Sequence, residues 1–108
     1  MIQQIPVQQL AAWLQAGEPV LLLDVRQPWE HEIAAFPGSV LVPLDLLPLK
    51  ARDLKPPSEA RIVVYCHHGI RSQSGASLLQ HLGFSNVVSL MGGIDAWSLL
   101  VNPGVPRY

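Results

Sequence analysis

A short segment near the middle of the chain holds the residues best suited to covalent chemistry. Residues 65–72 read Tyr-Cys-His-His-Gly-Ile-Arg-Ser, and Cys66 is the one cysteine among 108 residues. A thiolate is the nucleophilic form of cysteine, and the N–H groups of a tight turn running into a helix stabilise an anion. Arg71 adds a positive charge, and Gly69 permits the positive φ angle that such a loop requires. The pattern predicts a nucleophilic Cys66 in an anion-binding loop, rather than a buried structural thiol.

Two kinds of reaction use a loop of this type. One transfers a phosphoryl group to the thiolate, and the other transfers a sulfane sulfur and gives a cysteine persulfide. Four residues separate Cys66 from Arg71. Loops of the tyrosine-phosphatase type are one residue longer and ring a tetrahedral phosphate. The shorter loop favours sulfur transfer, and a phosphatase or arsenate reductase is the less favoured alternative.

Composition excludes several other classes of protein. One cysteine allows neither an internal disulfide nor a four-thiolate metal site. Seven Lys and Arg against eight Asp and Glu give a net charge of −1, which argues against nucleic acid as a partner. Apolar runs such as Val20–Leu23 are too short to span a bilayer, and the N-terminus has no signal-peptide pattern. We therefore expect a cytoplasmic protein with a reduced thiol, no membrane contact and no metal, since the adjacent His67 and His68 do not converge on one ion.

The segments around the loop predict an α/β fold in which a mostly parallel central sheet is flanked by helices. Strands are expected at Val20–Val25, Ser39–Val42, Arg61–Tyr65 and Asn86–Leu90. Helices are expected at Val7–Ala16, Ser72–Leu82 and Ile94–Val101, with two short helical turns within 44–54. The segment between the first two strands is interpreted as a loop, because Pro28 and Pro37-Gly38 interrupt it. Ligands of such sheets bind at the carboxyl ends of the strands, where Cys66 falls.

Four further residues have predicted structural roles. Ser72 is expected to cap the helix that follows the loop, and Gly75 to permit its close approach to the sheet. Asp24 and Arg26 end a strand and could reach the pocket, although an ion pair that fixes the adjoining loop is the favoured interpretation. His31 is expected to be an ordinary surface residue.

Three motifs, in order and with matching spacing, resemble those of the single-domain rhodaneses, which are thiosulfate sulfurtransferase-like proteins. The first is Leu23-Asp24-Val25-Arg26 with Trp29-Glu30 and Pro37-Gly38-Ser39, the second is Cys66–Ser72, and the third is Leu90–Trp97. The resemblance covers nearly the whole chain. It implies one rhodanese-like domain over residues 1–108, a three-layer sandwich, with 102–108 as a tail.

The resemblance also implies a mechanism. Cys66 would take the outer sulfur of a donor such as thiosulfate or a persulfide, and the N–H groups of His67, His68, Gly69, Ile70, Arg71 and Ser72 would hold the Cys66 persulfide. Cyanide or a thiol would then accept the sulfur, without a metal or an organic cofactor. Many members carry Arg directly after the cysteine, where this chain has His67. This departure favours a protein persulfide as the donor, and it motivates the alternative of a sulfur-relay module served by a protein partner.

Overall fold

The computed structural model describes residues 2–108 and places five parallel strands in one central sheet. The strands are β1 (Gln4–Ile5), β2 (Val20–Asp24), β3 (Val40–Leu41), β4 (Arg61–Tyr65) and β5 (Val87–Leu90). Their order across the sheet is β1-β5-β4-β2-β3, and each neighbouring pair is parallel. Asp24 lies opposite Tyr65 at the carboxyl ends of β2 and β4. The sequence segments after these two strands therefore begin side by side.

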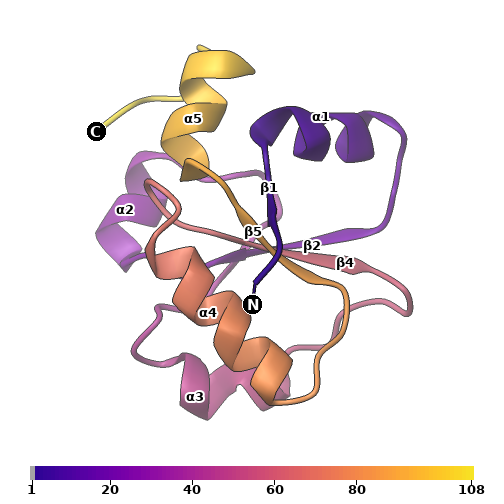
Figure 1. Ribbon diagram of the computed structural model, residues 1–108. Helices are drawn as coiled ribbons and strands as arrows, with labels where there is room; N and C mark the ends of the chain where they lie inside the picture. The colour runs from indigo at the N-terminus through magenta and orange to yellow at the C-terminus, as the bar shows by residue number, and fades with distance from the viewer. Residues whose placement is uncertain (1) are drawn as a thin grey trace.

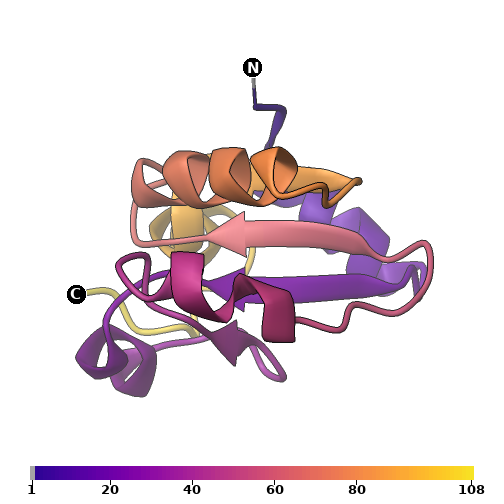
Figure 2. The same ribbon diagram turned by 90° about the horizontal axis from the view of Figure 1, so that it is seen from below.

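Helices cover both faces of this sheet. They are α1 (Val7–Gln15), α2 (Pro28–Ile33), α3 (Leu47–Lys50), the 3-10 turn η1 (Ala51–Asp53), α4 (Arg71–His81) and α5 (Gly93–Leu100). Figure 1 shows α1 and α5 on one side of the sheet, with α3 and α4 on the other. In Figure 2 the strand arrows point toward the end of the molecule where α2 lies. The predicted three-layer α/β fold is confirmed.

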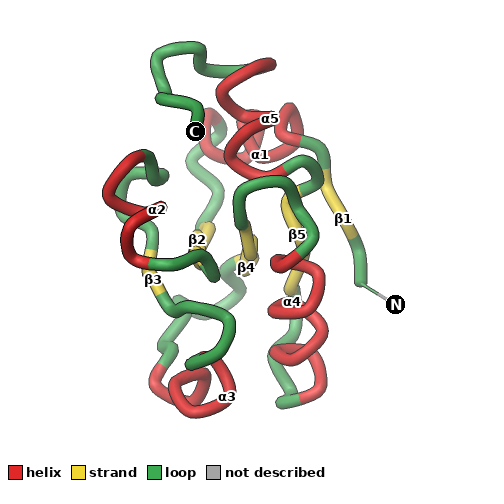
Figure 3. Tube along the Cα trace, turned by 90° about the vertical axis from the view of Figure 1, so that its left-hand side faces the viewer, coloured by secondary structure: helices red, strands yellow, loops and turns green. Residues whose placement is uncertain are grey.

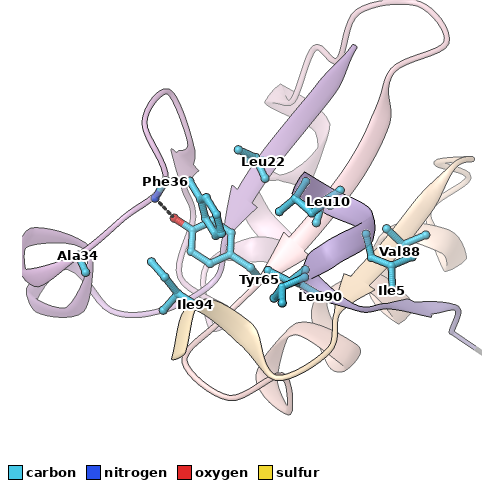
Figure 4. Close-up of a cluster of buried hydrophobic side chains, with 11 residues drawn as sticks. Ile5, Leu10, Leu22, Ala34, Phe36, Tyr65, Val88, Leu90 and Ile94 are labelled. Carbon is cyan, nitrogen blue, oxygen red and sulfur yellow. Dashed lines mark hydrogen bonds between the residues drawn. The ribbon is translucent and has the colours of Figure 1, made fainter. Parts of the chain in front are cut away.

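The core is divided in two by the sheet, because alternate residues of a strand face opposite sides. Leu22 and Val63 belong to the cluster beneath α1 and α5, whereas Leu23 and Val64 belong to the cluster beneath α3 and α4. Figure 4 shows the first cluster, in which the Tyr65 hydroxyl accepts a 3.3 Å hydrogen bond from the backbone N–H of Phe36. The near-continuous apolar strands are thus explained by burial on both faces.

The predicted close approach of α4 to the sheet is also present. A Cβ atom on Gly75 would lie 3.2 Å from side-chain carbons of Val25 and Val64. The turns within 44–54 form as α3 and η1, since Pro48 lies in the first turn of α3, where no backbone donor is required.

Two predictions about local structure are wrong, and one strand has no predicted counterpart. The segment after β2 is not only loop, because α2 begins at Pro28, with a reciprocal capping box between Gln27 and Glu30. Ser72 does not cap α4: the helix begins at Arg71, after Ile70. The short edge strand β1 was not predicted, since two residues are too few to show a period. No helix within residues 2–108 combines the length and the apolar composition needed to cross a membrane.

Candidate active site

The loop that joins β4 to α4 lies at the carboxyl end of the sheet. Figure 3 faces this end and shows the loop between α2 and α5. Cys66 follows directly after β4, and α4 begins at Arg71. The buried strand therefore delivers the thiol to the base of the loop, and the first turn of α4 directs its free N–H groups toward it.

The sulfur of Cys66 accepts hydrogen bonds from this loop. The backbone N–H of Gly69 donates to Sγ at 3.1 Å, and that of Ser72 donates at 3.4 Å. Cys66 is 1% exposed, so little water competes with these donors. Within the described part of the chain, no protein acceptor pairs with the N–H groups of His67, His68 and Ile70. The loop thus supplies two donors to the sulfur and keeps further amides available for an anion.

Ser72 also faces the sulfur with its side chain. Its Oγ lies 3.6 Å from Cys66 Sγ and 2.7 Å from Oγ of Ser89, a fully buried residue of β5. The neutral Cys66 thiol donates to Ser72 Oγ, whereas the Ser72 hydroxyl can donate to the Cys66 thiolate when the Ser89 hydroxyl donates to Ser72. This contact replaces the expected capping role of Ser72, because a side chain turned toward the sheet cannot reach back over the helix end.

The amino end of α5 fixes the shape of the loop. The N–H of Ile94 donates to the carbonyl oxygen of Cys66 at 2.9 Å, and the N–H of Asp95 donates to that of His67 at 3.1 Å. A Cβ atom on Gly93 would collide with both of these carbonyl oxygens. A Cβ atom on Gly69, whose φ is +95°, would lie 2.8 Å from the nitrogen of Gly92. The paired glycines after β5 therefore permit the close contact that holds the loop.

The open side of the loop, bordered by His67 and Arg71, is its mouth, and Arg71 does not bring an unpaired charge to it. Its guanidinium donates to both oxygens of Glu30, at 2.7 and 2.8 Å. Glu30 is buried, and its hydrogen bonds with Arg71 lower its pKa from 4.5 to about 2 despite the opposing effect of burial. The same bonds raise the pKa of Arg71. Both groups are charged at neutral pH, and α2 is tied to α4.

Asp24 and Arg26 form a fully buried ion pair beside this site. The Arg26 side chain donates to both Asp24 oxygens, at 2.8 and 2.7 Å, and also to the carbonyl oxygen of Ala34 at 2.6 Å. The favoured interpretation of an ion pair that fixes the adjoining loop agrees with these contacts. His31 is not an ordinary surface residue, because its Nδ1 lies 2.8 Å from Asp24 Oδ2.

Tyr108, near the C-terminal end of the sequence, lies at the mouth of the loop. Its hydroxyl donates to Glu30 Oε1 at 2.8 Å and accepts from Arg26 at 2.7 Å. Its ring stacks on His67, with centroids 3.8 Å apart and planes 9° from parallel. Burial raises the pKa of Tyr108 to about 12, so the phenol is neutral. Burial also lowers the pKa of His67, with a further lowering by the neighbouring His68.

A model of the family described as rhodanese-like domain matches residues 6–100. The chain belongs to the rhodanese-like domain family. A sulfurtransferase from Allochromatium vinosum is 33% identical over 98 residues, which are 91% of this chain and 90% of that protein. The Mycobacterium tuberculosis protein named "Probable adenylyltransferase/sulfurtransferase MoeZ" is 35% identical over 96% of this chain, which spans 26% of the length of that relative.

Solved structures agree with the family. The crystal structure of a thiosulfate sulfurtransferase from Pseudomonas aeruginosa gives a TM-score of 0.84 at 27% identity, covering 98% of this chain and 20% of that one. A rhodanese-like domain protein from Staphylococcus aureus gives 0.82 at 24% identity and 99% coverage of both chains, which bears on the fold alone.

Only some of the predicted site residues of this rhodanese-like chain belong to the loop around Cys66. The backbone of residues 66–72 forms the loop. At the rim of the loop, Ile70 is 76% exposed and the side chain of His68 is 60% exposed. Asp24 and Arg26 lie behind the mouth, and their hydrogen bonds in the described structure go to groups other than Cys66. In residues 2–108, no cluster of three or more His, Cys, Asp and Glu is placed to hold a metal ion.

Sequence reasoning missed three residues of the site: Glu30, Ser89 and Tyr108. A signal existed for Glu30, since the spacing Gln27-Pro28-x-Glu30 is that of a capping box with proline at the first helical position. No local pattern marks the other two, because their contacts join segments that are 17 and 78 or more residues apart.

Proposed function

We propose that this chain is a sulfurtransferase that carries a sulfane sulfur on Cys66 as a persulfide. The observation that carries the proposal is the Cys66 sulfur at the base of its loop, with N–H donors from Gly69 and Ser72. The similarity to the Allochromatium vinosum sulfurtransferase over nearly its full length supports it. In this proposal residues 1–108 act as one domain, and a reducing, cytoplasmic setting keeps the thiol free.

The reaction divides into two balanced half-reactions. In the first, the Cys66 thiolate attacks the outer sulfur of thiosulfate; a Cys66–sulfur bond forms, the sulfur–sulfur bond of the donor breaks, and sulfite leaves with its electron pair. The product is a Cys66 persulfide anion. In the second, cyanide attacks the terminal sulfur, thiocyanate leaves, and the thiolate returns. The sulfur moves without an external oxidant, so two substrates react in turn at one nucleophile.

The loop supports these steps by holding negative charge on sulfur. The donors of Gly69 and Ser72 stabilise the thiolate, while the amides of His67, His68 and Ile70 are available for the terminal sulfur of the persulfide. Preorganised N–H groups in a site shielded from water need no rearrangement as charge moves.

A specific observation favours a protein or low-molecular-weight persulfide as the donor. Arg71 is neutralised by Glu30, and His67 stands where many rhodaneses carry arginine. A dianion such as thiosulfate therefore meets little free positive charge, whereas a persulfide places less charge in the mouth. Relatives named adenylyltransferase and sulfurtransferase combine such a domain with others, which agrees with a sulfur relay that receives its sulfur from a protein partner.

Steady-state kinetics test the proposal. Purified protein is given thiosulfate or cysteine persulfide as the donor and cyanide as the acceptor, and thiocyanate is measured while both concentrations are varied. We expect parallel lines in double-reciprocal plots, typical of a ping-pong mechanism, and complete loss of activity in Cys66→Ser. Thiocyanate formation above the protein-free rate that survives in Cys66→Ser, or intersecting lines with both donors, would contradict it.

A further inference from the structure

Tyr108 lies over the mouth of the loop and contacts three separate parts of the site. Its ring stacks on His67 of the loop, and its hydroxyl joins Arg26 to Glu30. Its ring also meets the exposed Trp29 of α2 edge to face, with centroids 5.8 Å apart. A side chain fixed by hydrogen bonds on one edge and by stacking on its face has a defined position, so it shapes what can enter.

The groups beneath Tyr108 are paired in charge. Arg26 is neutralised by Asp24, and Arg71 by Glu30. The phenol hydroxyl links these two pairs without adding charge of its own, since it donates to the carboxylate and accepts from the guanidinium. This leaves His67 as the side chain in contact with Tyr108 whose charge can change near neutral pH.

Stacking against Tyr108 covers one face of the half-buried His67 imidazole. Its Nε2 atom is buried and has no hydrogen-bond partner within residues 2–108. A protonated ring would leave that N–H unsatisfied, which disfavours the charged form. The lowered pKa of His67 agrees with this geometry. The charged and titratable groups that face His67 are His68, Asp95, Glu30, Arg71 and Tyr108.

We propose that Tyr108 is a specificity-determining residue that keeps His67 covered and neutral, so that the site prefers persulfide donors of low charge to dianionic thiosulfate. This inference rests on the proposed sulfur transfer at Cys66 and names its donor class. The sulfur donor it fits is a persulfide on a small molecule or on a protein side chain: the Cys66 thiolate attacks its outer sulfur, the sulfur–sulfur bond of the donor breaks, and the donor's thiolate leaves with the electron pair. Arginine at position 67 would carry a permanent charge at the same place, and a neutral imidazole does not.

Removing the aromatic ring should change this preference in a pH-dependent manner. In Tyr108→Ala the His67 ring regains water, and it should protonate as the pH falls below its ordinary value of about 6.5. A positive charge beside the loop then attracts a dianion more than a donor with one net negative charge. An ion pair that is partly exposed changes binding by up to about fivefold.

The experiment compares two donors on Cys66 in single turnovers. Thiosulfate is the dianion, and cysteine persulfide has one net negative charge because its ammonium offsets its carboxylate. The rate of Cys66 persulfide formation is measured by mass spectrometry at pH 6 and pH 8. We expect the thiosulfate-to-persulfide rate ratio to rise by up to about fivefold at pH 6 in Tyr108→Ala, with little change at pH 8.

Three further variants separate the effect of charge on His67 from simple opening of the mouth. Tyr108→Phe keeps the stacked ring and should show no gain at pH 6, whereas His67→Arg should raise the ratio at both pH values. In the double variant Tyr108→Ala with His67→Asn, the gain at pH 6 should be absent. An equal acceleration of both donors in Tyr108→Ala, or a gain that persists in the double variant, would overturn the inference.

A measurement on the unaltered protein keeps the inference testable if Tyr108→Ala does not fold. An NMR titration of the His67 ring should give a pKa below about 6.5 in wild type and in Tyr108→Phe. A pKa at or above that value in wild type would overturn the inference. Failure of the proposed function is distinguishable, since wild type would then form no Cys66 persulfide with either donor.

Discussion

The bond between Glu30 and Arg71 allows a quantitative prediction about stability. Glu30→Gln keeps the shape of the side chain and removes the negative charge that accepts two hydrogen bonds from Arg71. The pKa of Glu30 falls from 4.5 to about 2 on folding. At about 1.36 kcal/mol per pKa unit, this fall corresponds to about 3 kcal/mol of folding free energy at pH 7. That figure is an upper value, because the Arg71 side chain is 37% exposed and water screens the pair.

The sign of the pH dependence follows from the lowered pKa of Glu30. Its carboxylate stabilises the folded state fully above about pH 4.5, and the stabilisation is lost as the pH falls toward 2. Linkage gives a loss of about 1 kcal/mol of this stabilisation between pH 7 and pH 3.5. The free-energy difference between wild type and Glu30→Gln should therefore narrow by up to that amount over this range.

Urea unfolding followed by tryptophan fluorescence measures this difference at both pH values. Glu32→Gln is the matched control, since Glu32 is exposed on the same helix α2 and its loss should change stability by no more than about 0.5 kcal/mol. A difference between wild type and Glu30→Gln that stays constant from pH 7 to pH 3.5 would refute the reasoning, because the effect would then not depend on the ionised carboxylate.

Two further predictions concern the groups that shape the loop. Gly93→Ala should destabilise the protein by about 2 kcal/mol more than Gly17→Ala in urea unfolding. Both glycines have positive φ, but only Gly93 is packed on the carbonyl oxygens of Cys66 and His67. Equal losses of stability in the two variants would contradict this contact. Ser89→Ala should lower the free energy of unfolding by about 1–3 kcal/mol, because it leaves the buried Ser72 hydroxyl without its 2.7 Å partner. The double variant Ser72→Ala with Ser89→Ala should lose less stability than the sum of the two single variants. Strict additivity would show that the two hydroxyls are not coupled.

The sequence predicts the strands and helices that carry the loop because these elements have strong local patterns. The apolar runs of β2 and β4, the β-branched residues of β4 and the position of Gly17 after α1 all match the structure. The errors occur where local patterns compete. The pattern predicts an interruption at Pro28, although this residue begins α2, and it predicts a helix cap at Ser72, although the Ser72 hydroxyl turns toward Ser89.

The rest of the candidate site depends on contacts between distant segments, which local patterns do not contain. Glu30 reaches Arg71 across 41 residues, and Tyr108 reaches Arg26 across 82. The sequence of 102–108 offers no reason to place a tyrosine over His67, because only the packing of the segment against α5 and the core brings it there. The pairing of β2 with β4 as parallel neighbours, by contrast, brings their carboxyl ends together, so it is a signal that the residues after these two strands meet.

The central claim is that Cys66 carries the transferred sulfur, and intact-mass spectrometry tests it most directly. Wild type and Cys66→Ser are each incubated with thiosulfate or cysteine persulfide and desalted, and their intact masses are measured. Cyanide is then added and the masses are measured again. We predict a gain of one sulfur atom in wild type, no gain in Cys66→Ser, and return to the starting mass as thiocyanate forms. An unchanged wild-type mass with both donors, or an equal gain in Cys66→Ser, would contradict the claim.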